Sequence, residues 1–213
     1  MVVRSVSSAR RGWVLVETDR GSWMIPARKA RSLELSRGAQ IATERLVQTA
    51  VKSQTAAARR DTGRYLARSE HTESQLEGHL TRKGYLPEVV TETIAWAHRL
   101  GYVDDLRYAR AYVGSHLGGR SPMGSRRLLL ELRKRGVDDS DARRAVEEVD
   151  ERGMENQLTE TVRKRYAHLK PEVARRRAKA FLSRRGFDWD TSRRVLEKAL
   201  EDLSDASESN SGG

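Results

Sequence analysis

A helical pattern that occurs three times constrains the fold of this chain more than any other feature. Its second copy runs from Gly124 to Val137 and contains a leucine-rich stretch, followed by three cations and then a glycine. The glycines that close the three copies, Gly84, Gly136 and Gly186, stand 52 and then 50 residues apart. Ten residues past each glycine, an aliphatic residue falls inside a further helical pattern. A period of this length indicates a repeated unit built from several helices.

The second copy has the pattern of one amphipathic helix. At about 100° per residue, Leu128, Leu129 and Leu132 fall on one side. The opposite side carries four cations, Arg126, Arg127, Arg133 and Lys134. Leu130 departs from this division, because it falls among the cations. Gly136 has the position of a left-handed C-cap, so the helix should end there.

The first 50 residues have a different pattern, in which β-forming residues predominate. Residues 13–17 and 22–26 are rich in such residues and flank a short polar segment, which predicts a hairpin. Residues 2–6 could add a third strand, and a short helix over 27–35 could follow. We therefore expect a small β-containing unit at the N-terminus.

From about Thr43 the hydrophobic period changes from 2 to 3.6. The first helix of the first repeat is expected at 54–68. Residues 204–213 are polar and acidic and are expected to be disordered. The predicted fold class is mainly α: three tandem three-helix repeats, preceded by a small β-hairpin-containing unit. The expected domains are the N-terminal unit at 1–50, the three repeats at 54–103, 104–152 and 153–203, and the tail.

Composition points to an anionic partner. Lys and Arg number 41 against 30 Asp and Glu, which gives a net charge of +11. Such an excess favours nucleic acid or an acidic protein face, although solubility alone is the alternative. The absence of Cys excludes a disulfide framework and cysteine zinc sites. No apolar run is long enough for a membrane span, so we expect a soluble, cytoplasmic protein.

No constellation of residues indicates an enzyme. The sequence contains neither a phosphate-binding loop nor a dinucleotide fingerprint. The five histidines are scattered, and none has the i, i+4 spacing of a helical metal pair. The aspartates cluster at predicted helix starts, where capping explains them. We expect no catalytic residue, no metal and no cofactor.

The cations of the helix that precedes each closing glycine are distributed unequally among the repeats. The four basic positions of the second copy correspond in the third to Arg176, Arg177, Ser183 and Arg184, and in the first to Ser74, Gln75, Thr81 and Arg82. A need for solvation would affect all three helices alike. The inequality therefore indicates a binding face on the second and third copies, with an ordinary solvated face as the alternative.

Two further features lie at this face. The loop 118–122 leads into a helix start beside Arg120, where free backbone N–H groups could seat a phosphate or a carboxylate. Leu130 suits a protein partner, because interfaces use apolar anchors ringed by charge. Packing of Leu130 under a neighbouring helix is the alternative.

Three segments of the repeats are recognisable. They read Arg-Tyr-Leu-Ala-Arg-Ser-Glu at 64–70, Leu-Gly-Tyr-Val-Asp-Asp-Leu-Arg-Tyr-Ala at 100–109 and Leu-Arg-Lys-Arg-Gly-Val at 132–137. Together they resemble the bacterial RecX family of recombinase regulators. The resemblance covers roughly residues 54–200, and the segment at 100–109 is its most specific part.

The resemblance implies a non-enzymatic regulator that binds the RecA recombinase and its filament on single-stranded DNA. It implies inhibition of ATPase, strand-exchange and coprotease activity, with roles in recombination, DNA repair and the SOS response. It also implies a curved, elongated body of helix triplets that lies in the filament groove.

We expect a monomer that contacts single-stranded or double-stranded DNA directly or through RecA, and no membrane. The alternative is a stand-alone nucleic-acid-binding helical module, since a basic helix fits a major groove. The candidate contact residues are Arg120, Arg126, Arg127, Leu130, Arg133, Lys134, Arg176, Arg177, Lys179 and Arg184.

Overall fold

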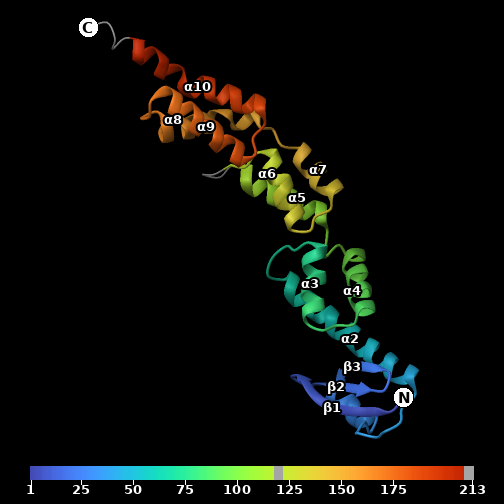
Figure 1. Cartoon of the computed structure of the whole chain (residues 1–213). Coiled ribbons are helices and arrows are strands. Elements are labelled where there is room, and N and C mark those ends of the chain that lie inside the picture. Colours follow the sequence, from blue (N-terminus) through green and yellow to red (C-terminus); the bar gives the residue numbers. More distant parts are fainter. Residues whose placement is uncertain (118–121, 209–213) are drawn as a thin grey trace. The chain divides into compact units, whose positions relative to one another are not determined.

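The computed structural model describes residues 1–117 and 122–208, and for residues 201–208 only the backbone (Figure 1). Over these residues the chain forms one three-stranded sheet, ten α-helices and one 3-10 turn. It divides into two compact units, Met1–Asp104 and Asp105–Gly213. The mainly helical class with a small N-terminal sheet is therefore confirmed.

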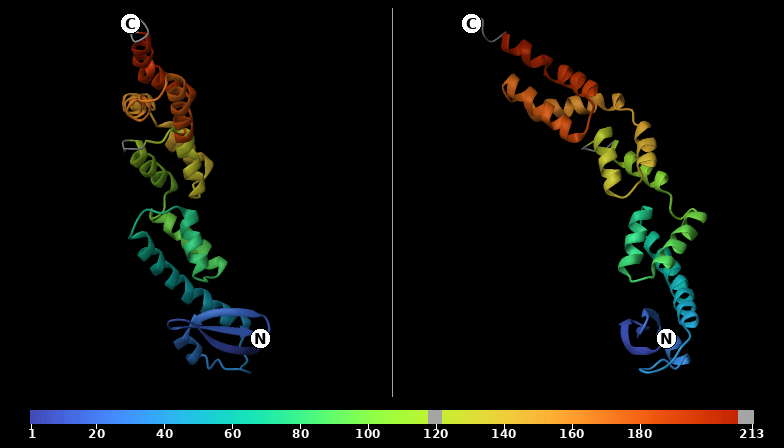
Figure 2. Two further views of the ribbon diagram at one scale, coloured as in Figure 1. Left: turned by 60° about the vertical axis from the view of Figure 1, so that its left-hand side comes forward. Right: turned by 45° about the vertical axis from the view of Figure 1, so that its right-hand side comes forward.

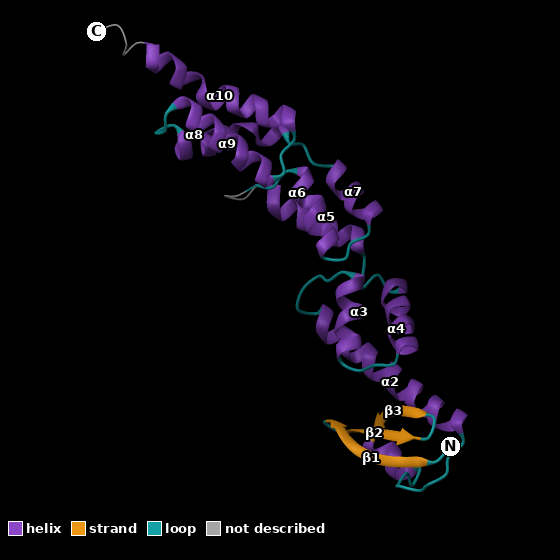
Figure 3. Ribbon diagram, in the orientation of Figure 1, coloured by secondary structure: helices purple, strands orange, loops and turns teal. Residues whose placement is uncertain are grey.

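The sheet consists of three antiparallel strands in the order β1 (Val3–Arg10), β2 (Trp13–Thr18) and β3 (Gly21–Pro26), drawn orange in Figure 3. The predicted hairpin and third strand are confirmed, and β1 is longer than expected because it pairs with β2 as far as Arg10. The helix that follows, α1 (Ala27–Ser32), ends before residue 35, since Glu34 takes a left-handed φ of 53°. The buried residues of this region are Val3, Val16, Ile25, Ala30, Leu35, Leu46 and Ala50.

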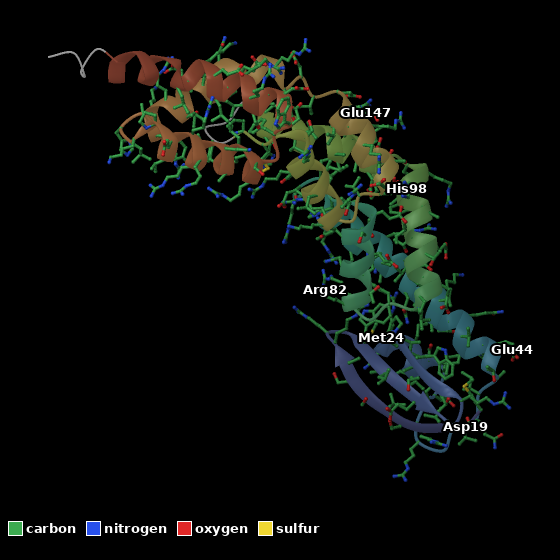
Figure 4. All side chains as sticks on the ribbon, turned by 45° about the horizontal axis from the view of Figure 1, so that its top comes forward. Asp19, Met24, Glu44, Arg82, His98 and Glu147 are labelled. Atoms are coloured by element: carbon green, nitrogen blue, oxygen red, sulfur yellow. The ribbon has the colours of Figure 1, made fainter. Side chains whose placement is uncertain are left out.

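The helix α2 (Thr43–Leu66) joins the sheet to the first repeat, as both views of Figure 2 show. The expected start at residue 54 is wrong, because the helix begins at Thr43 and no Gly or Pro interrupts it before Gly63. Gln54 is fully buried at its middle. Its amide donates to the carbonyl of Met24 at 2.8 Å and accepts from the N–H of Leu86 at 2.9 Å. Met24, labelled in Figure 4, lies where the sheet meets these helices.

The first repeat is completed by α3 (Glu73–Arg82) and α4 (Pro87–Arg99). Thr72 and Gln75 form a capping box at the start of α3, and proline occupies the first turn of α4. The buried residues of this repeat are Ala57, Ala58, Leu76, Leu80, Tyr85, Val89, Val90, Ile94, Ala97 and Val103.

The second unit contains the second and third repeats. The second repeat consists of α5 (Asp105–Leu117), α6 (Ser125–Lys134) and α7 (Asp139–Glu147), and the third of η1 (Arg152–Met154), α8 (Glu155–Tyr166), α9 (Pro171–Arg185) and α10 (Trp189–Glu208). Leu80, Leu132 and Leu182 are fully buried at equivalent positions, and the glycine after each helix is left-handed, with φ of 74°, 82° and 84°. This correspondence supports the alignment of the three copies.

Polar side chains start two helices of the second unit as expected. Asp138 accepts from the N–H groups of Ser140 and Asp141 before α7, and Asp188 accepts from Thr191 before α10. The helix α10 continues through Glu208, past the residue at which the tail was expected to begin. Neither Gly nor Pro occurs in α10 to stop it. Residues 209–213 lie outside the described part of the chain.

Candidate partner and nucleic-acid interface

The last turn of α9 contacts the first turn of α6 through the backbone. The N–H of Gly124 donates to the carbonyl of Arg185 at 2.9 Å, and the N–H of Arg126 donates to the carbonyl of Gly186 at 3.2 Å. A Cβ on Gly124 would lie 2.4 Å from the backbone nitrogen of the residue after Gly186, and a Cβ on Gly186 would lie 2.3 Å from that of Arg127. Two glycines therefore allow the helices to meet at backbone contact.

One buried carboxylate serves two helix starts beside this contact. Glu151 is 8% exposed and accepts from the N–H of Ser125 at 2.6 Å and from the N–H of Asp188 at 3.2 Å. These bonds satisfy N–H groups that a helix start leaves without an intrahelical partner. At the start of α6, the N–H of Ser125 is thus taken by the protein's own carboxylate. Arg120 and the rest of 118–121 lie outside the described residues.

The side chains of α6 and α9 border a groove with a volume of about 310 Å³. Leu130, which is 50% exposed, lies among the lining residues. Packing of Leu130 under a neighbouring helix, the alternative considered above, therefore does not occur within the described residues. The complete lining is Arg126, Arg127, Leu130, Glu131, Lys134, Ser183, Arg184 and Gly186.

The groove is strongly basic, with four cations against one carboxylate. Arg127 is fixed, because its Nη1 donates to the carbonyl of Arg184 at 3.2 Å. Glu131 pairs with Arg135 at 2.9 Å and with Lys134 at 3.6 Å. The hydrogen bond from Arg135 lowers the pKa of the Glu131 carboxyl, and this effect outweighs desolvation, which raises it. Within the described residues, Arg126 and Arg184 form no ion pair. Their charges are therefore available to an anionic ligand.

The structure separates the candidate residues into groups. Arg126, Arg127, Leu130, Lys134 and Arg184 line the groove together. Arg133 does not, because its Nε donates to Asp139 at 2.7 Å near the start of α7. Three further candidates are exposed on α9 outside the groove, namely Arg176, Arg177 and Lys179.

Sequence reasoning missed two acidic residues of this site. Glu131 is the carboxylate of the lining, and its i, i+4 spacing to Arg135 was a signal that could have identified it. Glu151 lies 26 residues from Ser125, so no local pattern connects the carboxylate to the helix it caps. The glycine pattern identified Gly186 as a helix end, but it could not show that this end meets α6.

The helix α3 of the first repeat lacks most of the cations found at the equivalent positions of α6 and α9. On α3 the corresponding positions include Ser74 and Gln75, and the side chain of Gln75 is used by the capping box. Lys and Arg are therefore concentrated on the helices before the closing glycines of the second and third repeats, as the sequence indicated.

These features define a tandem three-helix-repeat protein whose second and third repeats share a basic groove with an exposed apolar residue. Three family models match the chain: the first three-helix domain of RecX over residues 59–96, the second over 104–146 and the third over 155–196. The chain belongs to the RecX family, whose members are regulatory proteins.

Curated relatives and solved structures agree with this assignment. Regulatory protein RecX of Thermobifida fusca (strain YX) is 36% identical over 141 residues, which are 65% of this chain and 76% of that protein. Regulatory protein RecX of Prosthecochloris aestuarii (strain DSM 271 / SK 413) is 33% identical over 138 residues, 64% of this chain and 89% of that protein.

Two crystal structures share the fold. One, of a regulatory protein RecX, has a TM-score of 0.63 at 18% identity and covers 94% of this chain and 98% of its own. The other, of RecX from Lactobacillus salivarius, has a TM-score of 0.64 at 22% identity and covers 70% of this chain and 97% of its own. At these identities the likeness shows the fold alone.

Membrane-spanning helices and metal-binding clusters are both absent from the described residues. None of their helices has both the length and the apolar character needed to cross a membrane. No group of three or more His, Cys, Asp or Glu side chains among them is arranged to hold a metal ion.

Proposed function

We propose that this protein is a non-enzymatic regulator that binds the RecA recombinase and its filament on single-stranded DNA, and inhibits the ATPase, strand-exchange and coprotease activities of RecA. Membership of the RecX family of regulatory proteins supports this proposal. The proposed contact surface is the groove between α6 and α9, with Arg176, Arg177 and Lys179 as an extension along α9. The processes served would be recombination, DNA repair and the SOS response.

The exposed Leu130 carries the proposal. A leucine that is 50% exposed among Arg126, Lys134 and Arg184 gains nothing in the isolated protein. Against a protein partner it would supply an apolar anchor, while the cations around it pair with acidic side chains or nearby phosphates. Bare DNA would use the cations and leave the leucine in water.

Charge reversal in the groove tests the proposal. We would replace Arg126, Lys134 and Arg184 by Glu together and measure the ATPase rate of RecA on single-stranded DNA at fixed salt. Arg127 is spared, because its bond to the carbonyl of Arg184 helps to hold the two helices. The matched control reverses Arg28, Lys29 and Arg31 of α1, which is the same change in net charge.

The groove variant should lose inhibition while the control variant keeps it, with the helicity of both unchanged in circular dichroism. Full inhibition by the groove variant would refute the proposed surface. A wild-type protein that binds DNA tightly but leaves the ATPase rate unchanged would instead identify a stand-alone nucleic-acid-binding module.

Truncation of Leu130 to Ala tests the apolar component separately. Burial of the exposed half of a leucine is worth about 1 kcal/mol, so the variant should bind the filament roughly fivefold more weakly. Its affinity for naked DNA should not change. An equal loss for both ligands would mean that Leu130 does not anchor a protein partner.

A further inference from the structure

A second basic pocket lies within the first unit, with a volume of about 370 Å³. The turn between β1 and β2, the helix α2 and the end of α3 contribute its walls. Two aromatic side chains, Trp13 and Tyr85, also border it. Five of the lining residues are cations, namely Arg10, Arg11, Arg60, Arg64 and Lys83.

The acidic residue of this pocket, Asp61, is fully engaged. Its carboxylate accepts from Lys83 Nζ at 2.8 Å and from the Tyr85 hydroxyl at 2.7 Å, and it also pairs with Arg64. Asp61 therefore offsets charge on Lys83 and Arg64. It forms no hydrogen bond with the other three cations within the described residues.

Arg10 is a fixed cation that lines the pocket. Its guanidinium carbon lies 4.7 Å from the ring centroid of Trp13 and 4.6 Å from that of Tyr85, and its Nη1 donates to the carbonyl of Lys83 at 3.3 Å. Its Nε and Nη2 are buried and have no hydrogen-bond partner in the described part of the chain. Arg10 forms no ion pair within the described residues, and a positive charge that is partly removed from water is screened less by solvent than an exposed one.

Arg11 and Arg60 complete the arrangement. Arg11 and Arg60 are exposed and line the pocket. Neither forms an ion pair within the described residues. Arg11 comes from the β1–β2 turn and Arg60 from α2, so two exposed guanidinium groups border the same pocket as the fixed Arg10. Such groups match the paired oxygens of phosphate well.

We propose that this pocket binds the phosphate backbone of a nucleic acid strand, with Arg11 and Arg60 contacting phosphates and Arg10 supplying a fixed positive field. The exposed large apolar residues of the described chain are Val2, Leu100, Tyr102, Leu130 and Trp189, and none of them lines the pocket. It therefore lacks the apolar anchor that a protein interface needs and that the groove of the second unit has. Phosphate contacts need only positive groups and hydrogen-bond donors. This site would act on nucleic acid without RecA, so it goes beyond the function proposed above.

The experiment measures binding of a fluorescein-labelled oligothymidylate to the full chain by anisotropy, without RecA, over a range of salt concentrations. The test variant replaces Arg11 and Arg60 by Glu, and a milder variant replaces both by Gln. The control reverses Arg28 and Lys29. All are also made in the background of the groove variant R126E/K134E/R184E, so that pocket and groove are separated.

Loss of two phosphate contacts should reduce the slope of log K against log salt by about 1.4, and the control should leave it unchanged. The same reduction in the groove-variant background would support an independent site. Unchanged affinity and slope in both Arg11/Arg60 variants would overturn the proposal. Displacement of the oligonucleotide by polyglutamate as readily as by unlabelled oligonucleotide would also overturn it, in favour of an acidic protein partner. No outcome depends on RecA, so failure here leaves the proposed regulation untouched.

Discussion

Replacement of Asp61 by Asn should remove a pH-dependent contribution to the stability of the first unit. Asp61 is 6% exposed and accepts hydrogen bonds from Lys83, Tyr85 and Arg64. Burial by itself raises the pKa of the Asp61 carboxyl. The three donors outweigh burial and lower this pKa from 3.8 to about 2. The ionised form is therefore favoured in the folded protein.

The size of the effect follows from this fall in pKa. A decrease from 3.8 to about 2 corresponds to about 2 kcal/mol of unfolding free energy. Because the pKa is lower in the folded than in the unfolded state, the contribution is fully present above the unfolded value and is lost as pH falls toward the folded value. Between about pH 5 and about pH 2, the wild type should lose about 2 kcal/mol more than Asp61→Asn.

Tryptophan fluorescence during urea unfolding can follow the first unit alone. The chain has four tryptophans, of which Trp13, Trp23 and Trp96 lie in the first unit. The fourth, Trp189, is 62% exposed, so Trp189→Phe makes a suitable background for both proteins. If wild type and Asp61→Asn lose stability in parallel over this pH range, the three donors do not hold the carboxylate as described and the reasoning fails.

Two further variants probe the contact between α6 and α9, both by urea unfolding followed by circular dichroism. Gly186→Ala combines left-handed strain with a Cβ that would lie 2.3 Å from the nitrogen of Arg127. The control is Gly84→Ala, at the equivalent helix end of the first repeat, where φ is also left-handed but a Cβ would meet no atom closer than 3.9 Å. Gly186→Ala should therefore destabilise the second unit by more than about 1 kcal/mol beyond what Gly84→Ala costs the first unit. Equal losses for the two would contradict the close backbone contact. Glu151→Ala leaves two backbone N–H groups without their acceptor and should cost about 2 kcal/mol, and a loss near zero would show that neither bond contributes.

The features that could be predicted from sequence are local ones. A left-handed glycine, a capping Asp138 or a proline in the first helical turn acts on its own helix, so the spacing of a few residues predicts it. The position of Leu130 among the cations could also be predicted, since helical geometry fixes its face. These signals predicted the repeats and the basic character of α6.

The arrangement of the groove depends on contacts that spacing does not contain. The Arg127 side chain reaches the carbonyl of Arg184, 57 residues away. Arg133, on the same helix, pairs instead with Asp139 at the start of α7 and does not line the groove. The start of α2 was misjudged for a related reason, because its first turns are stabilised by packing of Leu46 and Ala50 with the sheet.

The long helix α2 also decides how the first unit should unfold. Its early residues Leu46 and Ala50 pack with the sheet, its later residues Ala57 and Ala58 pack in the first repeat, and Gln54 ties both together. The border between the sheet region and the first repeat therefore falls inside α2, whose backbone hydrogen bonds continue across it. Unfolding of either region would break hydrogen bonds of this helix and so destabilise the other region. Amide protons of both regions should exchange through one cooperative opening. The match to the first RecX three-helix domain begins at residue 59, so that domain is smaller than the segment that gains or loses its structure together.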